Sequence, residues 1–309
     1  MNFKKIIFVV GPTAVGKSDA AFCLAQNIGG EVISCDSMQV YKEIRVASNK
    51  PAQDVLDAVP HHLVSILSVG QEFDVAQFNQ HTLEIIDEIH NKDHIPIIVG
   101  GSGLYMQILL DGIFKGGVKN EALRRGLKEQ ANQQGNQFLY DKLKEADPQA
   151  ASKIHPNDIR RVIRALEVFM GEKMPISQLR EDRQGLWGKF DISLFALDRQ
   201  RPELYDRINA RVERMFERGI IDEIKRVEED QWGKTAKMII GVQEIQGFLR
   251  GEYDLEETKQ KIKLNTRRLA KRQLTWFRQE KRLTWVTVGP EDTAESVART
   301  MLDEWKAVR

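Results

Sequence analysis

Short runs of apolar residues alternate with stretches of helical length along the first third of the chain. Ile6–Val10 is an unbroken run of five β-branched and aromatic residues that ends at a glycine, and Glu31–Ser34 and Ile95–Val99 are two further short runs. Runs of this kind are typical of strands buried on both faces of a parallel sheet. Because a segment long enough for a helix separates each run from the last, the order predicts an α/β fold.

The segment before the third run has a clear helical face. Asp74 stands immediately before this segment and is placed to cap a helix. The residues that recur on one face at spacings of three and four are Val75, Phe78, Thr82, Ile85, Ile86 and Ile89. The sequence therefore predicts an amphipathic helix that packs against the sheet.

The pattern changes in the second third of the chain. Gly112, Gly116 and Gly117 interrupt it, and residues 120–170 have charged, helical patterns without a strand-like run. Beyond a second segment that contains glycine and proline, Ile192–Leu197 has the pattern of a strand that returns to the sheet. This order predicts a helical insertion within an α/β domain.

A phosphate-binding motif follows the first predicted strand. Residues 11–18 match the pattern G-x-x-x-x-G-K-[ST] and precede a predicted helix, which is the context that the motif requires. Its glycines let backbone N–H groups turn towards a diphosphate, Lys17 supplies a positive charge, and the Ser18 hydroxyl can reach Mg²⁺. A glycine turn that merely connects a strand to a helix would not need a lysine followed by a hydroxyl. The residues expected to bind a diphosphate or nucleotide are Gly11, Pro12, Thr13, Ala14, Val15, Gly16, Lys17 and Ser18.

The motif completes the predicted architecture. We expect a P-loop three-layer α/β/α core with a parallel sheet, formed by residues 1–115 and 186–309 and including the C-terminal helices. Residues 116–185 are expected to form an all-helical insertion domain.

Two other strand ends carry candidate functional residues. Asp36 follows the second predicted strand, and Ser102 lies in a glycine-rich segment after the third. Because the carboxyl ends of parallel strands line the ligand crevice, both should lie near the phosphate loop. The Asp36 carboxylate there could hold Mg²⁺ through water or act as a general base. Alternatively, Asp36 or Ser37 caps the next helical turn.

The composition narrows the class of protein. The chain has 309 residues, of which 41% are hydrophobic and 29% charged, which excludes collagen-like, low-complexity and wholly disordered chains. The net charge is +1, so no global field indicates a nucleic acid or membrane partner. Two cysteines are too few for a disulfide framework, and no apolar stretch approaches the roughly 20 residues that span a bilayer. We expect a soluble, cytoplasmic protein with no membrane partner.

Basic residues are concentrated in one segment near the C-terminus. Ten lysines and arginines lie between Lys259 and Arg282, against the single acid Glu280. Apolar or small residues recur there at helical spacing, so one face can pack on the core while the basic face meets solvent or a phosphate backbone. The inward positions are Ile262, Thr266, Ala270, Leu274 and Phe277, and the acids that could balance the charge are Asp254, Glu256 and Glu257. From the residues alone, both interpretations of this helix stay open.

Taken together, the motifs resemble those of the tRNA dimethylallyltransferase family, also called tRNA isopentenyltransferases. The similarity extends over nearly the whole chain, and the motifs occur in the family's order. The matching segments are Gly11–Ser18, Asp36–Tyr41, Pro60–Leu63, Gly100–Tyr105, His155–Asp158 with the arginines that follow, and Ala270–Trp276. The chain lacks the zinc-finger extension of eukaryotic members, so the resemblance implies a bacterial-type enzyme.

The resemblance implies transfer of the dimethylallyl group from dimethylallyl diphosphate to N6 of the adenosine just 3′ of the anticodon, position 37 of tRNA. The charge of the leaving diphosphate would be neutralised by Lys17, by backbone N–H groups and by Mg²⁺. Ser18 and the diphosphate would hold this Mg²⁺. Asp36 would take the acceptor's proton. The resemblance also places Ser102 beside the reacting centre and Arg201 on the diphosphate. Any binding of ATP to the loop would be incidental to turnover.

The same resemblance suggests where tRNA binds. Reaching N6 requires extrusion of the adenosine from its stack, and a helical insertion with arginines could close over the anticodon stem-loop. The protein is expected to act as a monomer. The residues expected to contact tRNA are Asp36, Ser37, Met38, Gln39, Ser102, Arg124, Arg160, Arg161, Val162, Ile163, Arg164, Lys271 and Arg272.

Three segments depart from the family's pattern. Cys35 stands where a glycine usually precedes the aspartate, Ala47–Pro51 replaces a G-T-A-K-type stretch, and Ile240–Glu244 lacks the usual tyrosine and lysine. These departures affect tRNA contacts rather than the candidate catalytic groups. Ser48 and Asn49 could still supply polar donors.

Other functions are also compatible with a phosphate loop. A P-loop kinase of a nucleotide or small metabolite would share the loop, the acid and Mg²⁺, but no arginine-bearing lid follows the third strand. A nucleic-acid-binding NTPase would explain the basic segment, but no apolar run ends in an acidic pair for ATP hydrolysis. Two histidine pairs, His61 with His62 and His90 with His94, could suggest a metal, but neither pair has a third ligand at the right spacing.

Overall fold

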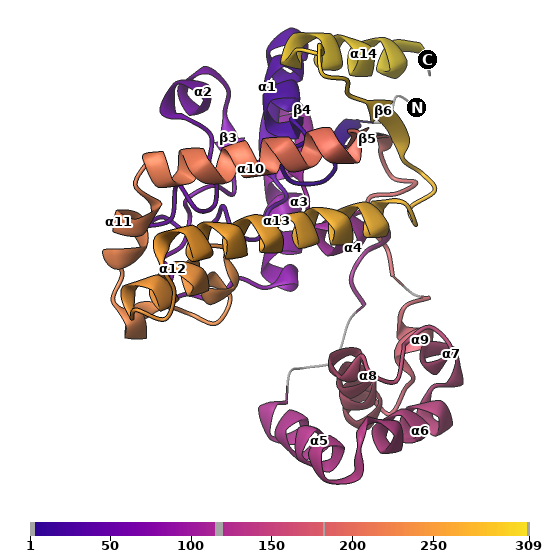
Figure 1. Cartoon of the computed structure of the whole chain (residues 1–309). Helices are drawn as coiled ribbons and strands as arrows, with labels where there is room; N and C mark the ends of the chain where they lie inside the picture. Colours follow the sequence, from indigo (N-terminus) through magenta and orange to yellow (C-terminus); the bar gives the residue numbers. More distant parts are fainter. Residues whose placement is uncertain (1–3, 115–119, 182, 308–309) are drawn as a thin grey trace. The chain divides into compact units, whose positions relative to one another are not determined.

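The computed structural model describes residues 4–114, 120–181 and 183–307, which divide into two compact units (Figure 1). The sheet unit comprises Met1–Gln107 and Gly188–Arg309, and the helical unit comprises Ile108–Trp187. The sequence-based boundaries were placed at residues 115/116 and 185/186. The first of these, together with the expected breaks at Gly116 and Gly117, lies outside the described residues.

The sheet unit is built on one six-stranded sheet in the order β3-β2-β4-β1-β5-β6, in which every pairing is parallel. The predicted α/β fold is confirmed. The strands expected from sequence are present, whereas the short strands β3 and β6 were not expected. The strands are β1 Lys5–Val10, β2 Gly30–Ser34, β3 His61–His62, β4 Ile95–Gly100, β5 Asp191–Asp198 and β6 Thr284–Thr287.

Strand β1 lies in the middle of the sheet because its residues are apolar on both faces. Ile6–Val10 is at most 1% exposed, and the strand pairs with β4 on one side and β5 on the other. Its last residue, Val10, is in register with Gly100 of β4 and Ala196 of β5. The segments that follow these strands therefore start from the same edge of the sheet.

Helices pack on the sheet and on one another. α1 packs against α14, and α10 lies beside α13 (Figure 1). The predicted cap of α3 is confirmed, since Asp74 accepts hydrogen bonds from the backbone N–H groups of Ala76 and Gln77. The helices are α1 Lys17–Ile28, α2 Gln53–Ala58, α3 Val75–Asn91, α4 Gly103–Asp111, α10 Arg201–Glu217, α11 Ile220–Lys225, α12 Val242–Leu249, α13 Leu255–Phe277 and α14 Ala294–Ala307, with 3₁₀ turns at Glu229–Gln231 and Ala236–Met238.

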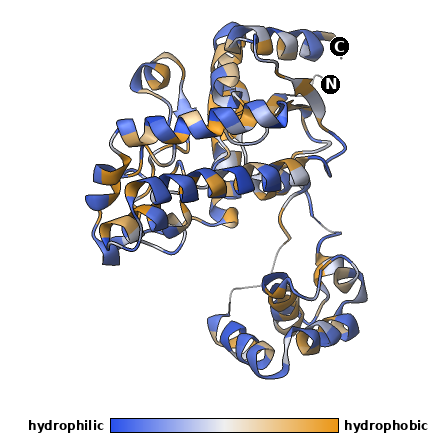
Figure 2. Cartoon of the chain, viewed as in Figure 1, coloured by the Kyte–Doolittle hydropathy of each residue, from blue (hydrophilic) through white to orange (hydrophobic). Residues whose placement is uncertain are grey.

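The basic C-terminal segment forms α13, as its periodicity predicts. Four of the five expected inward residues are buried, and Leu274 is partly buried. Its outer face is strongly hydrophilic (Figure 2). Part of this charge is balanced within the sheet unit, because Lys259 and Lys263 both form ion pairs with Glu213 of α10.

The helical unit contains no strand in its described part, as expected. Its core is formed by apolar residues of α5, α6 and α8, including Leu127, Leu139 and Leu166. Its helices are α5 Glu121–Gln134, α6 Asn136–Ala146, α7 Pro148–Ala151, α8 Ile159–Glu172 and α9 Ile176–Leu179. Among the residues that the structure describes, no helix of either unit is long and apolar enough to cross a membrane.

Candidate active site

A cavity of about 740 Å³ lies at the carboxyl ends of β1, β2 and β4, within the sheet unit. Its wall combines the phosphate loop, the segment after β2, the glycine-rich segment after β4 and faces of α10 and α13. The cavity thus brings together motifs that are far apart in the sequence. The predicted site residues that line it are Thr13, Ala14, Gly16, Lys17, Ser18, Asp36, Ser37, Met38, Gln39, Ser102 and Arg272.

The phosphate loop requires glycine where it leaves the sheet. Gly11 has a φ of 145°, and a Cβ there would lie 2.7 Å from the carbonyl oxygen of Leu197 in β5. α1 begins at Lys17 without a side-chain cap, so its first N–H groups stay available to an anion. Gly11, Pro12 and Val15 shape the loop but do not line the cavity.

Lys17 is the lysine of the loop and is partly buried at the cavity wall. Its Nζ donates to the carbonyl oxygen of Pro12 at 3.1 Å. Burial lowers the pKa of Lys17 to about 8, although the nearby Asp36 carboxylate acts in the opposite direction. No carboxylate in the described part of the chain forms an ion pair with it, so a bound polyphosphate would restore the charge that burial disfavours.

Three arginines of α10, rather than Arg201, face the cavity. Arg207, Arg211 and Arg214 line it, whereas Arg201 is exposed at the start of the helix, where its Nε donates to the Tyr205 hydroxyl at 3.1 Å. None of the three was expected from the sequence, although their spacing of four and three residues places them on one face of a helix.

Arg211 lies deepest of the three. Its Nη1 donates to the hydroxyl of Thr13 at 2.6 Å, and its Nε is buried without a partner in the described structure. Burial also lowers the pKa of Arg211, against the opposing effect of Asp36. Arg207 also contacts the loop, because its Nε donates to the carbonyl oxygen of Ala14 at 2.9 Å. A buried, unsatisfied guanidinium nitrogen beside a phosphate loop fits an anionic ligand.

Asp36 lies on the cavity wall in a turn rather than at a helix N-terminus. Its Oδ1 accepts from the backbone N–H of Met38 at 2.9 Å, and residues 35–52 contain no helix. The helix-cap alternative for Asp36 and Ser37 is therefore wrong, because the chain forms a local Asx-type turn here. The carboxylate keeps acceptor capacity towards the cavity, as a base or an Mg²⁺ ligand requires.

Ser102 follows β4, the strand next to β2, and lines the same cavity as Asp36. Its backbone N–H donates to the carbonyl oxygen of Cys35 at 3.4 Å. A Cβ at Gly100 would lie 2.0 Å from the same oxygen, so only glycine lets the two segments approach this closely. Burial raises the pKa of the Cys35 thiol, so it stays neutral beside Asp36.

Gln39 is fixed on two sides. Its Oε1 accepts from the Ser34 hydroxyl at 2.8 Å, and its Nε2 donates to the carbonyl oxygen of Asn49 at 3.2 Å. Asn49 belongs to Ala47–Pro51, a segment that departs from the family pattern. Ala47, Ser48 and Asn49 of this segment line the same cavity. The Ser48 hydroxyl, expected as a donor at this rim, donates instead to the carbonyl oxygen of Ile44 at 2.6 Å.

The predicted tRNA-contacting residues of the helical unit differ in exposure. Arg160 and Arg161 are exposed on α8, and Ile163 is partly buried. Val162 is fully buried in the core of the unit, so its side chain is not accessible to a nucleic acid. Arg124 and Arg164 both form ion pairs with the buried Glu167. On α13, Lys271 is exposed outside the cavity lining.

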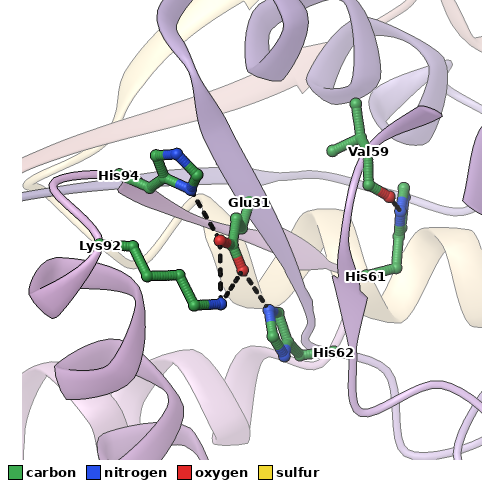
Figure 3. Close-up of polar contacts among 6 residues, drawn as sticks. All are labelled: Glu31, Val59, His61, His62, Lys92 and His94. Carbon is green, nitrogen blue, oxygen red and sulfur yellow. Dashed lines mark hydrogen bonds and ion pairs between the residues drawn. The ribbon is translucent and has the colours of Figure 1, made fainter. Parts of the chain in front are cut away.

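Two of the histidines, His62 and His94, contact a buried carboxylate. Figure 3 shows His62, His94 and Lys92 directed at the buried Glu31. Nε2 of His62 and Nδ1 of His94 each lie 2.7 Å from a carboxylate oxygen of Glu31. Burial acts to raise the pKa of Glu31, but hydrogen bonds from these three side chains hold it below its usual value. Within the described residues, no group of three or more potential ligands could hold a metal ion.

Comparisons with known proteins identify the family to which the chain is similar. The family model described as IPP transferase matches residues 39–280. The tRNA dimethylallyltransferase of Alkaliphilus oremlandii is 40% identical over 306 residues, covering 98% of this chain and 97% of that protein. The protein of the same name from Carboxydothermus hydrogenoformans is 41% identical over 303 residues, with 97% of each chain covered.

Solved structures show the same similarity. The tRNA isopentenylpyrophosphate transferase of Bacillus halodurans superposes with a TM-score of 0.71 at 38% identity, over 98% of this chain and 96% of that one. A eukaryotic dimethylallyltransferase whose structures show it acting on tRNA has a TM-score of 0.82 at 28% identity, over 99% of this chain and 80% of that one.

Proposed function

The chain belongs to the IPP transferase family, and from this membership we infer that it transfers a dimethylallyl group to tRNA. We further propose that the donor is dimethylallyl diphosphate and the acceptor is N6 of the adenosine at position 37. One observation carries this proposal: the phosphate loop, Asp36 and Ser102 line one cavity together with lysine and arginine side chains. No carboxylate in the described residues forms an ion pair with these cations.

The leaving diphosphate is held by the cations of the loop and of α10. Lys17, the N-terminal N–H groups of α1 and Arg211 converge on the place where its negative charge develops as the carbon–oxygen bond breaks. Arg207 and Arg214 line the same wall, and we propose that they take the role expected of Arg201. Mg²⁺, if bound there, would neutralise further charge; the Ser18 hydroxyl and the Asp36 carboxylate offer it hard oxygen ligands.

Asp36 acts on the acceptor. As the bond between N6 and the donor's C1 forms and diphosphate departs, the Asp36 carboxylate accepts the proton that N6 loses. Gln39 and Met38 line the same cavity and would contact the extruded base, and Ser102 lines it as well. Val212, Met215 and Leu269 give the cavity an apolar wall for the dimethylallyl chain.

The tRNA itself would bind the exposed basic groups. Arg272 and Lys271 on α13 and Arg160 and Arg161 on α8 are exposed and suited to contact phosphates of the anticodon stem-loop. We expect the protein to act in this way as a cytoplasmic monomer, which chromatography of the protein with and without tRNA would test.

The proposal is tested by nucleoside analysis of unmodified tRNA after incubation with the protein, Mg²⁺ and dimethylallyl diphosphate, without ATP. The expected result is one adenosine that gains a dimethylallyl group, only in tRNAs with adenosine at position 37. A Lys17→Ala variant serves as the negative control. Formation of ADP from ATP and a metabolite, without any mass gain in tRNA, would instead favour the kinase alternative, which the comparisons do not favour.

A further inference from the structure

Gln273 of α13 joins two parts of the cavity wall that are far apart in the sequence. Its Oε1 accepts from the backbone N–H of Thr13 in the phosphate loop at 2.8 Å. Its Nε2 donates to the carbonyl oxygen of Gly101, next to Ser102, at 3.1 Å. One amide side chain therefore connects the loop that holds the donor to the segment that borders the acceptor.

The packing around this contact leaves little freedom. A Cβ at Gly101 would lie 2.2 Å from Nε2 of Gln273, and a Cβ at Gly103 would lie 2.2 Å from the ring of Trp276, one turn further along α13. The glycine-rich segment after β4 is thus held directly against this helix. Through Gln273, α13 therefore contacts both the phosphate loop and the carbonyl oxygen of Gly101.

Thr13 is fixed from a second direction as well. Its hydroxyl accepts from Arg211 while its backbone N–H donates to Gln273. The first residues of the phosphate loop are therefore oriented by side chains of α10 and α13 rather than by the loop alone. The Thr13 amide is thus used by Gln273 rather than by a ligand, and this contact fixes the start of the loop whose remaining amides would bind a diphosphate.

We propose that Gln273 is a positioning residue for the transfer reaction, which fixes the donor diphosphate relative to the Ser102 segment and the acceptor nitrogen. This inference rests on the proposed function. The primary amide of glutamine carries an acceptor and a donor on one short, planar group, whereas ionised glutamate lacks the donor and methionine lacks both N–H donor and oxygen acceptor. A misplacement of reacting atoms by about 1 Å is enough to slow a reaction on the order of 10²-fold.

The test compares Gln273→Met, which keeps length and approximate volume but removes both hydrogen bonds, with Gln273→Glu, which keeps an acceptor but loses the donor to Gly101. Gln260→Met is the matched control, because Gln260 is an exposed glutamine of the same helix. The measurements are kcat and KM for dimethylallyl diphosphate, the Kd for inorganic diphosphate by calorimetry, the Kd for tRNA, and the thermal midpoint.

For Gln273→Met we expect kcat/KM for the donor to fall on the order of 10²-fold. We also expect a Kd for inorganic diphosphate that rises roughly fivefold and a tRNA Kd that stays within about twofold. Gln273→Glu should raise the donor KM further, since it places a negative charge beside the diphosphate. A loss of folded protein alone would lower the apparent kcat but leave KM and the diphosphate Kd of the folded fraction unchanged.

The outcomes separate this inference from the proposed function. If both Gln273 variants match the wild type in donor kcat/KM and diphosphate Kd, the positioning role is wrong even though transfer occurs. If the wild type transfers nothing but Gln273→Met still weakens diphosphate binding, the proposed function fails while Gln273 retains its role in holding the phosphate loop. If Gln273→Met does not fold, Gln273→Glu carries the same measurements.

Discussion

Positively charged side chains of the sheet unit and of the helical unit differ in whether a carboxylate pairs with them. In the sheet unit, Lys17 and Arg211 lie at the cavity, and no described carboxylate forms an ion pair with either. In the helical unit, Arg124 and Arg164 both donate to Glu167, whose side chain is 1% exposed. Similar sequence signals, basic residues on a helix or loop, therefore lead to two different structural roles.

The difference is one of electrostatic compensation. A cation without a counter-ion in a partly buried cavity is disfavoured until an anion binds, which is reflected in the lowered pKa of Lys17. For Glu167, burial acts to raise the pKa, but the hydrogen bonds from Arg124, the Asn120 backbone and Arg164 hold it below its usual value. The cavity cations are available to a ligand, and the arginines at Glu167 stabilise the helical unit.

The largest effect is expected when Asp36, the carboxylate of the cavity wall, is removed. Asp36→Ala is expected to lower kcat by on the order of 10²–10⁴-fold, because the acceptor loses its proton acceptor. The tRNA Kd should change little, since the tRNA phosphates are expected to bind elsewhere. Single-turnover transfer with a tRNA-binding assay measures both, and full activity of this variant would exclude Asp36 as the base.

Removal of an uncompensated cation should have the next largest effect. Lys17→Met keeps much of the side-chain length but removes the charge, and kcat/KM for the donor should fall roughly 10²–10³-fold. The folded state should be weakened little, because no ion pair is broken and the described contact that is lost is one hydrogen bond to the carbonyl oxygen of Pro12. Steady-state kinetics measure the loss of donor turnover, and a thermal unfolding curve of the same preparation measures stability. A thermal midpoint as low as that of Glu167→Gln would contradict the difference between the two units.

In the helical unit, a change of charge should lower stability and leave the donor kinetics unchanged. Glu167→Gln leaves Arg124 and Arg164 without their buried counter-ion and should lower the free energy of unfolding by about 3 kcal/mol. The donor KM should be unaffected, since Glu167 belongs to the other unit. Glu129→Gln, at an exposed position of α5, is the control. Denaturant unfolding measures the change, and equal stability of the two variants would contradict the role given to Glu167.

The pH profile provides a smaller but more specific test. Because the pKa of Lys17 in the free protein is lowered to about 8, its charge is present below that pH and is lost above it. We expect kcat/KM for the donor to be level below about pH 8 and to fall up to tenfold per unit above it. Lys17→Arg stays charged throughout and should remove this decline. A decline that persists in the variant would assign the titration to another group.

The smallest effects are expected at the exposed arginines. Arg160→Ala and Arg161→Ala should each weaken tRNA binding a few-fold and reduce the salt dependence of log Kd by about one unit of slope. Arg124→Ala should leave that slope unchanged while it lowers stability, because its guanidinium is already committed to Glu167. Filter binding at several salt concentrations distinguishes the two kinds of arginine.

The sequence predicts the strands that carry apolar runs and fails at the others for a physical reason. β1, β2, β4 and β5 were expected because each contains a short run of apolar residues. β3 is only two residues long and consists of histidines, and most residues of β6 are exposed at the edge of the sheet. Neither has the continuous apolar pattern on which the prediction depends.

The candidate site was predicted in part. The motifs at the strand ends indicate Lys17, Asp36 and Ser102, because parallel strands bring their carboxyl ends together. Arg211 was detectable in principle from the periodicity of α10. The bond from Gln273 to Thr13 was not, because it joins residues 260 positions apart and no local pattern records it.

The position of β1 between β4 and β5 has a consequence for the growing polypeptide on the ribosome. β4 ends at Gly100 and β5 begins at Asp191, with the helical unit encoded between them. At about 5–20 residues per second, translation of that interval takes on the order of 5–20 s. During this time the most apolar strand of the nascent chain has a hydrogen-bonding edge with no neighbour, and such edges favour aggregation. We therefore expect chains arrested before residue 191 to depend on chaperones more than chains released after it.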